Sequence, residues 1–239
     1  WIASQPWCNG RIGGVGGSYM GMTQWQPSVR AHPALRSMCT IVTEANLYDA
    51  AWTSGALNLE LAALWAFQET EPEGFDPATR DNLAALRILP LTRIDIAGAG
   101  RVIPFWQDWL AHPTRDDYWG AVAADQYETI DVPVFHIGGW YDVFALGTIA
   151  DYEGMATRAP SSRTRQAQRL LMGPWRHGNW SNADGRIGAV EFGPHSWPNL
   201  MEVMLGWMDR TLKDMPTGQD APVRLFVMGE NVWRDEQEW

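Results

Sequence analysis

The sequence predicts an α/β fold, and two features of its hydrophobic pattern support this prediction. Short apolar runs without polar alternation recur between glycine and proline residues, which is typical of strands buried on both faces of a parallel sheet. Segments with apolar residues three and four positions apart lie between and after these runs, and this spacing is typical of amphipathic helices. Strands that alternate with helices indicate a sheet covered by helices.

Four apolar runs are expected to form the strands of this sheet. In chain order they are Arg11–Gly16, Ser37–Val42, Pro133–Gly138 and Gln168–Gly173. A helix is expected to start near Tyr19, directly after the first run, and helical periodicity is clearest over 57–65 and 201–212. We therefore expect 1–46 and 126–214 to be two parts of one α/β core.

The segment 47–125 between these two parts has a different pattern. Its helical repeats are broken by prolines, including Pro90, Pro104 and Pro113, and it contains no convincing strand. We expect it to be a helical cap inserted into the α/β core.

Both ends of the chain are expected to be incomplete. The segment 215–220, which contains proline and glycine, separates the last helical repeat from a new apolar run, Val223–Gly229. This pattern predicts that 215–239 is a linker followed by the first strand of a further, C-terminal β domain. The chain starts at Trp1 without an initiator methionine or a signal segment. It is thus expected to be an internal fragment that lacks the N-terminal strands of its sheet.

The composition excludes several classes of protein. The chain has 239 residues, of which 46% are hydrophobic and 19% charged, with a formal net charge of −10. A disordered chain would be less hydrophobic, and a membrane span would need a run of about 18 apolar residues, which this sequence lacks. A nucleic-acid groove needs clustered basic residues, whereas Lys213 is the only lysine and the arginines are scattered. Neither nucleic acid nor a membrane is expected as a partner.

No metal or other cofactor is expected from the cysteines and histidines. Cys8 and Cys39 form neither a disulfide framework nor a C-x-x-C pair, and the five histidines are isolated from one another. A chain without a disulfide framework weakly favours the cytoplasm over secretion, and the compartment is left open because the N-terminus is expected to be missing from this sequence.

Ser18 is the first candidate for a chemical role. It lies in the turn Gly16–Gly21 between the first predicted strand and the helix that follows. This is the pattern of a nucleophile elbow, in which small neighbours permit a strained turn that exposes the serine hydroxyl above a sheet. The usual form is G-x-S-x-G, whereas here Met20 occupies the second glycine position and Gly21 follows one residue late. The alternative is a serine that only caps the helix.

A serine nucleophile needs a histidine base and a carboxylate that orients it, and hydrolases of this pattern have them in the order serine, acid, histidine. His177 comes just after the fourth predicted strand, Gln168–Gly173, at the sheet edge where ligands gather. His195 follows a loop and is the weaker candidate, while His136 lies inside an apolar strand and is expected to be a core residue. Asp142 follows the third predicted strand, in the order that the chemistry requires.

The motifs together resemble the cocaine-esterase (CocE/NonD) family of serine hydrolases. The resemblance runs through most of the chain in order, and it rests on five motifs: G-G-S-Y-M-G followed by T-Q-W, R-V-I-P in the cap, G-G-W-Y-D-V-F, G-P-W-R-H-G, and V-R-L-F-V-M-G near the end. The family is related to X-Pro dipeptidyl-peptidases, α-amino-acid ester hydrolases and cephalosporin acylases. Membership would imply an α/β-hydrolase fold with a helical cap and a C-terminal jelly roll.

The resemblance also implies a role for several residues. It makes Ser18 the nucleophile, Asp142 the orienting acid and His177 the general base. The backbone N–H of Tyr19 would be one donor to the oxyanion. The second donor of the family, a tyrosine hydroxyl, would lie N-terminal to this chain.

The same resemblance implies an aromatic pocket for the acyl group. Trp65 in the cap and Phe144, two residues after the acid, match pocket walls of the family, and Trp140 is a further candidate. Arg176 departs from the family, in which serine or threonine usually precedes the histidine. A guanidinium turned toward His177 would disfavour the protonated imidazole.

The expected function is hydrolysis of carboxylic esters of small acyl substrates through an acyl-enzyme. The alternatives are X-Pro dipeptidyl-peptidase or β-lactam acylase activity on amides, and a non-catalytic module that binds aromatic ligands. Peptidase-like members need carboxylates that pair with a substrate ammonium. Glu44 and Asp49 are candidates for this, although we expect them to be solvated loop acids. The expected partner is a small acyl substrate, and a homo-oligomer is left open.

Overall fold

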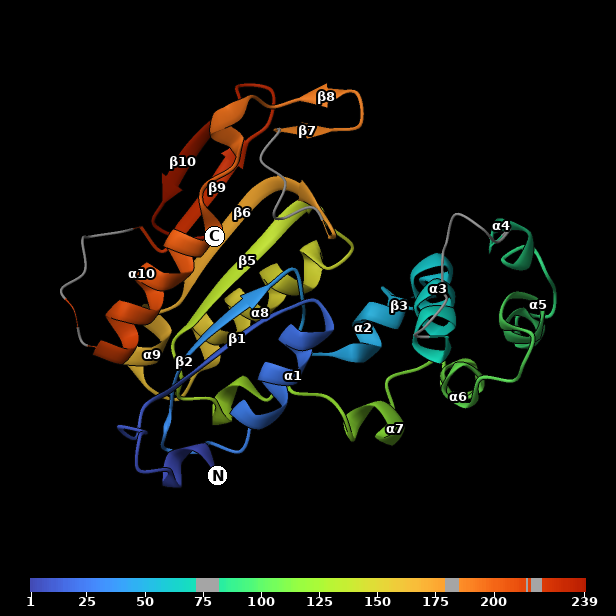
Figure 1. Cartoon of the computed structure of the whole chain (residues 1–239), viewed down its shortest axis with the longest axis horizontal. Coiled ribbons are helices and arrows are strands. Elements are labelled where there is room, and N and C mark those ends of the chain that lie inside the picture. The colour runs from blue at the N-terminus through green and yellow to red at the C-terminus, as the bar shows by residue number, and fades with distance from the viewer. Residues whose placement is uncertain (72–81, 179–184, 214, 216–220) are drawn as a thin grey trace. The chain divides into compact units, whose positions relative to one another are not determined.

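The computed structural model describes residues 1–71, 82–178, 185–213, 215 and 221–239 (Figure 1). The chain divides into two compact units, of which the first comprises 1–46 and 124–239 and the second comprises 47–123. The inserted segment was expected to end at Asp125, and the second unit ends at Ala123. Of the expected linker 215–220, all but Met215 lies outside the described residues.

A six-stranded sheet forms the centre of the first unit. Its strand order is β1-β2-β5-β6-β9-β10, and all neighbouring strands are parallel except β9 and β10. The strands are β1 (Ile12–Gly17), β2 (Leu35–Ile41), β5 (Val134–Tyr141), β6 (Arg169–Arg176), β9 (Val223–Val227) and β10 (Val232–Glu236). The four predicted strands are present, with ends shifted by one to three residues, and the α/β class is confirmed.

Helices cover both faces of this sheet (Figure 1). The helices of the first unit are α1 (Tyr19–Ser28), α8 (Ala145–Arg158), α9 (Ser162–Gln166) and α10 (Leu200–Lys213). On one face, Trp207 of α10 packs against Phe135 of β5 and donates a hydrogen bond to the carbonyl of Met38 (2.8 Å). On the other face, Trp25 of α1 and Met155 of α8 share a buried cluster with Met38.

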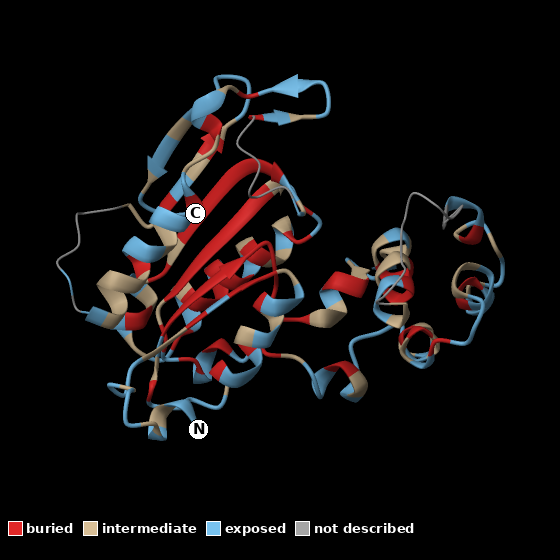
Figure 2. Cartoon of the chain, in the orientation of Figure 1, coloured by how far each residue is buried: buried red, intermediate tan, exposed pale blue. Residues whose placement is uncertain are grey.

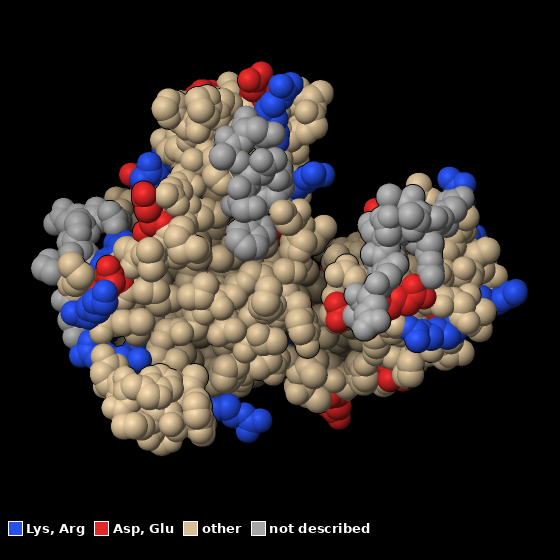
Figure 3. Space-filling view, viewed as in Figure 1, with Lys and Arg blue, Asp and Glu red and all other residues tan. Residues whose placement is uncertain are grey.

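Burial on both faces explains why the strands are apolar without alternation. Figure 2 shows the central strands as buried along most of their length. Neighbouring residues of one strand contribute to opposite clusters, as Met38 and Cys39 do on β2. On the face shown in Figure 3, uncharged residues form most of the centre of the first unit, and charged side chains lie mainly toward its margins.

The strand predicted near the C-terminal end is present as β9 (Val223–Val227). The run predicted to open a separate β domain forms β9, which pairs in parallel with β6 through Leu170 and Val223, and β10 returns antiparallel beside it. Val223 is buried in one cluster with Leu170 and Met172 of β6. β9 thus extends the central sheet and buries Val223 against β6, and its place at the start of a further β domain stays a prediction.

The second unit consists mainly of short helices. They are α2 (Leu47–Ala51), α3 (Leu59–Thr70), α4 (Asn82–Ala85), α5 (Ile94–Ala99), α6 (Pro104–Ala111) and α7 (Asp117–Gly120). The expectation that this unit has no strand is wrong, because β3 (Trp52–Thr53) and β4 (Ala56–Leu57) form a hairpin. Its two turn residues, Ser54 and Gly55, both have positive φ, as a tight hairpin turn requires. Strands this short leave no periodic signal.

The remaining described elements are one short hairpin and single turns of 3-10 helix. They are β7 (Arg186–Ile187) and β8 (Val190–Glu191), with η1 (Ile2–Ser4), η2 (Leu91–Arg93), η3 (Tyr127–Thr129) and η4 (Pro194–Ser196). Within the part of the chain that the structure describes, none of the helices combines the length and the apolar character that a membrane crossing requires.

Candidate active site

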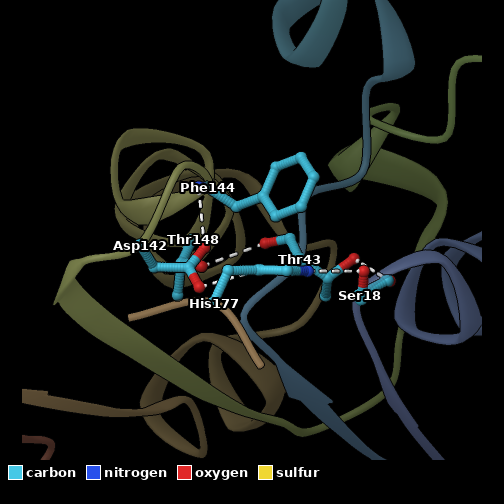
Figure 4. Close-up of polar contacts among 6 residues, drawn as sticks. All are labelled: Ser18, Thr43, Asp142, Phe144, Thr148 and His177. Carbon is cyan, nitrogen blue, oxygen red and sulfur yellow. Dashed lines mark hydrogen bonds and ion pairs between the residues drawn. The ribbon is translucent and has the colours of Figure 1, made fainter. Parts of the chain in front are cut away.

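Polar side chains follow four neighbouring parallel strands at the same edge of the sheet. Ser18 comes directly after β1, Thr43 two residues after β2, Asp142 directly after β5, and His177 directly after β6. Because these strands are parallel, their carboxyl ends meet at one edge, and Figure 4 shows the four side chains gathered there.

Ser18 occupies a strained turn between β1 and α1. Its φ is 54° and its ψ is −131°, a conformation that residues with a side chain rarely adopt. Its backbone N–H still continues the sheet by donating to the carbonyl of Ile41 (2.9 Å). The side chain makes no hydrogen bond to the backbone of the helix, so the helix-cap alternative is wrong. The turn instead presents the hydroxyl at the sheet edge.

Gly16 allows β1 to lie close to the first turn of α1. A Cβ atom at this position would lie 2.2 Å from the carbonyl oxygen of Met20 in the first turn of α1. Any side chain here would therefore force the helix away from the strand. The glycine two residues before the serine is therefore a steric requirement of the elbow.

The hydroxyl of Ser18 belongs to a line of hydrogen-bonded side chains. Its Oγ lies 2.8 Å from Nε2 of His177, and Nδ1 of His177 lies 2.9 Å from Oδ2 of Asp142. The Asp142 side chain is fully buried, and its other oxygen accepts a hydrogen bond from the N–H of Phe144 (2.8 Å). A carboxylate held in this way keeps the proton on Nδ1, which leaves Nε2 to accept the proton of the serine hydroxyl.

Tyr19 and Phe144 lie beside these residues. Tyr19 is the first residue of α1, so its backbone N–H belongs to the positive end of the helix. The Phe144 ring packs edge-on against the His177 ring, with centroids 5.2 Å apart, and the residue is 6% exposed. The structure thus brings two of the predicted accessory residues next to the serine and the histidine.

Trp140 and Trp65 lie in other surroundings. The indole N–H of Trp140 donates to the carbonyl of Phe226 on β9 (2.9 Å), and its ring packs with the cluster of α8 and β6. Trp65 belongs to the second unit, where it stacks on Trp109 with centroids 5.6 Å apart and planes at 12°. Their expected roles in an acyl pocket stay predictions.

The other histidines of the first unit, His32, His136 and His195, do not belong to this line of hydrogen bonds. His195 is exposed in η4, and its carbonyl accepts a hydrogen bond from the Trp233 indole (2.7 Å). His32 accepts from the N–H of Ala34 (3.1 Å) within a turn. His136 is fully buried in β5, with Nε2 3.2 Å from Oε1 of Gln168, as expected for a core residue.

Burial of His136 predicts a specific dependence of stability on pH. Desolvation lowers the pKa of this imidazole from 6.5 to about 3. Because the unfolded chain takes up this proton below pH 6.5 and the folded chain does so only near pH 3, the free energy of unfolding falls as the pH drops through this window. At pH 5 the loss amounts to about 2 kcal/mol. Urea unfolding at pH 7 and pH 5 measures it.

The variant His136→Gln is expected to lose this part of the pH dependence, while His195→Gln keeps it. The quantity to compare is the free energy of unfolding at pH 7 minus that at pH 5. His136→Gln also changes the packing, and this changes the stability at both pH values, so a single pH would not isolate the effect of the proton. An unchanged difference in His136→Gln would contradict the prediction.

Glu44 and Asp49 differ from each other in burial. Asp49 is exposed, as expected for a loop acid. The expectation that Glu44 is solvated is wrong, because it is 4% exposed and its carboxylate packs against Gly147 of α8. The sequence around Glu44 has no strand or helix period that would reveal this burial.

Arg176 and Cys39 are not part of the line of hydrogen bonds. Arg176 is exposed at the end of β6, and among the described residues no hydrogen bond or ring contact joins it to His177. Burial raises the pKa of the Cys39 thiol to about 12, which makes it a packing residue. Within the described ranges there is no group of three or more His, Cys, Asp or Glu side chains that could hold a metal ion.

Thr43 is the residue that the sequence analysis missed. Its hydroxyl donates to the carbonyl of Ser18 (2.7 Å), across 25 residues of sequence. The only available signal was the displaced glycine of the elbow. A Cβ at Gly21 would lie 2.5 Å from the methyl group of Thr43, so this glycine makes room for the threonine.

The chain is similar in sequence to a known family and to known proteins. The family described as X-Pro dipeptidyl-peptidase (S15 family) matches residues 1–179. The chain is 31% identical over 270 residues to the cocaine esterase of Rhodococcus sp. (strain MB1 Bresler), and the match covers 100% of this chain and 44% of that protein. The resemblance inferred from the motifs is therefore confirmed.

Two solved structures have the same fold. An aminopeptidase from a marine sediment Thaumarchaeota archaeon aligns with a TM-score of 0.80 and 25% identity, over 100% of this chain and 40% of that one. An α-amino acid ester hydrolase aligns with a TM-score of 0.75 and 23% identity, over 97% of this chain and 39% of that one. The predicted α/β-hydrolase fold is confirmed, and the chain spans less than half the length of the relatives that it matches.

Proposed function

The chain belongs to the X-Pro dipeptidyl-peptidase (S15) family, and on this premise we propose that it carries the catalytic centre of a serine hydrolase acting on carboxylic esters of small acyl groups. The observation that supports the proposal most is the continuous line from the Ser18 hydroxyl through His177 to the buried carboxylate of Asp142, with spacings of 2.8 and 2.9 Å. Similarity to a cocaine esterase favours the ester bond as the one cleaved.

In the proposed reaction, the Ser18 oxygen attacks the carbonyl carbon of the substrate while Nε2 of His177 takes the hydroxyl proton. The imidazolium that forms is stabilised by the Asp142 carboxylate at 2.9 Å. His177 then delivers the proton to the leaving alcohol, and the acyl group remains on the serine. A water molecule, deprotonated by the same imidazole, attacks the acyl-enzyme and releases the acid.

The negative charge that develops on the substrate oxygen needs donors that are already in place. The N–H of Tyr19 is the proposed donor from this chain, because the elbow places it at the N-terminal end of α1 beside the serine hydroxyl. Phe144 supplies an apolar wall next to His177. We propose that this wall contacts the substrate and keeps water away from the imidazole.

A panel of three substrates tests the proposal: an aryl ester, an α-amino ester and an X-Pro amide of similar size. We expect the highest kcat/KM for the aryl ester, with activity lost in Ser18→Ala and kept in the matched control Ser162→Ala, which changes an exposed serine. A higher kcat/KM for the X-Pro amide would favour peptidase activity, the alternative that the family name suggests. Hydrolysis that survives in Ser18→Ala would contradict the proposal.

A further inference from the structure

We propose that Thr43 is a positioning residue that fixes the peptide group between Ser18 and Tyr19, whose N–H faces the oxyanion. This inference rests on the proposed function, since it concerns the same reaction. The Thr43 hydroxyl donates a hydrogen bond of 2.7 Å to the Ser18 carbonyl oxygen, and Figure 4 shows it directed at the elbow.

The contacted carbonyl and the proposed oxyanion donor belong to one rigid unit. The Ser18 carbonyl and the Tyr19 N–H lie in the same trans peptide plane and point in opposite directions. The carbonyl points into α1, where it accepts from the N–H groups of Gly21 (2.8 Å) and Met22 (3.2 Å). The Tyr19 N–H is therefore directed out of the N-terminal end of the helix. A contact that fixes the carbonyl also fixes this N–H.

The strained backbone of Ser18 explains why the peptide needs such a contact. The direction of the Tyr19 N–H depends on ψ of Ser18, and the pair φ 54° and ψ −131° is not a preferred conformation. Strained conformations persist only where surrounding contacts hold them. The hydrogen bond from Thr43 supplies a contact from the segment after β2, independent of the helix itself.

Thr43 is itself held firmly enough to act as a reference point. Its own carbonyl accepts from the hydroxyl of Thr148 on α8 (3.0 Å), and Thr43 and Thr148 are each 2% exposed. The backbone on either side of Thr43 is also held. The N–H of Val42 donates to the carbonyl of Ile137 (2.7 Å), and the N–H of Ala45 donates to the carboxylate of Asp151 (2.9 Å).

The backbone before Thr43 is also strained. Val42 has a φ of 43°, which is rare for a β-branched residue. The chain thus adopts an unfavourable turn at the end of β2, and this turn leads directly to the residue that contacts the elbow. The two strained residues, Ser18 and Val42, lie next to each other in space because β1 and β2 are paired.

The hydrogen bond has an electronic consequence as well. A carbonyl that accepts several hydrogen bonds polarises its peptide group, which makes the attached N–H a stronger donor. The effect is greatest when negative charge develops on the substrate oxygen. Removal of the Thr43 hydroxyl should therefore weaken transition-state binding more than substrate binding, and so lower kcat more than it changes KM.

The test compares Thr43→Val, which removes the hydroxyl, with Thr43→Ser, which keeps it. With an aryl ester, and with kcat normalised to titrated active sites, we expect a loss of about 10- to 100-fold in Thr43→Val and a KM within twofold. This is less than the loss of about 10²–10³ for removal of a whole oxyanion donor, because the N–H remains. Thr43→Ser should stay within threefold of the unchanged protein.

A second readout separates positioning from folding. An aryl trifluoromethyl ketone forms a tetrahedral alkoxide on the serine, and its Ki should rise in Thr43→Val by the same factor by which kcat/KM falls. If Thr43→Val does not fold, Gly21→Ala provides the measurement, because its Cβ would lie 2.5 Å from the Thr43 methyl group and push the threonine aside. The same split between kcat and KM is expected.

Two outcomes would overturn this inference. One is a normalised kcat within twofold of the unchanged protein in Thr43→Val, and the other is an equal loss of normalised kcat in Thr43→Val and Thr43→Ser. In either case Ser18→Ala, measured in parallel, must still be inactive for the proposed function to stand. Activity in Ser18→Ala would overturn both proposals together.

Discussion

Substitution of Ser18 by alanine is expected to lower kcat for an aryl ester by a factor on the order of 10⁶. The reason is that the reaction loses its nucleophile, while the imidazole of His177 and the donors at the helix end remain. The fold should persist, because the Ser18 side chain makes no structural cap and is only half-buried. Steady-state rates and circular dichroism of the same samples measure both effects.

The matched control for this substitution is Ser162→Ala on α9. It removes the same hydroxyl from an exposed serine in the same unit, and we expect its kcat to stay within twofold. A folded Ser18→Ala variant with more than about one hundredth of the original kcat would rule out covalent catalysis by this serine.

Substitution of Asp142 by asparagine is expected to lower kcat by about 10⁴-fold. The buried carboxylate accepts from Nδ1 of His177 and from the N–H of Phe144, so it both selects the tautomer and stabilises the imidazolium. An amide of the same shape has no negative charge, and its NH₂ group can donate to Nδ1 and select the wrong tautomer. KM should change little, because the carboxylate lies behind the imidazole.

The kcat of Asp142→Asn, measured from pH 6 to pH 9, tests this role. The control is Asp209→Asn, which removes a carboxylate that pairs with Lys213 at the surface of α10. The control should retain its rate. A loss of less than tenfold in Asp142→Asn at every pH would show that the acid does not orient the base.

Much of the site could be predicted because its chemistry is coupled to chain order. Each of Ser18, Asp142 and His177 comes within four residues of the end of an apolar run, and parallel strands bring such positions to one edge of a sheet. A single polar residue after a strand is weak evidence for a catalytic site. A serine, an acid and a histidine in the required order together predict that the three side chains meet. The apolar runs themselves were visible because the strands are buried on both faces.

The features that escaped prediction depend on contacts between distant segments. The pairing of β9 with β6 could not be predicted from the residues near Val223, because it depends on burial against Leu170. Thr43 and Glu44 follow β2 without any periodic signal. The relation between Gly21 and Thr43 becomes visible only when the two segments lie side by side.

The most direct test of the central claim is to locate the adduct of a fluorophosphonate probe, which reacts only with activated serines. We predict a single covalent adduct that peptide mass spectrometry assigns to Ser18, with labelling lost in His177→Ala and strongly slowed in Asp142→Asn. An adduct on another serine, or labelling of Ser18 at an unchanged rate in His177→Ala, would contradict the account.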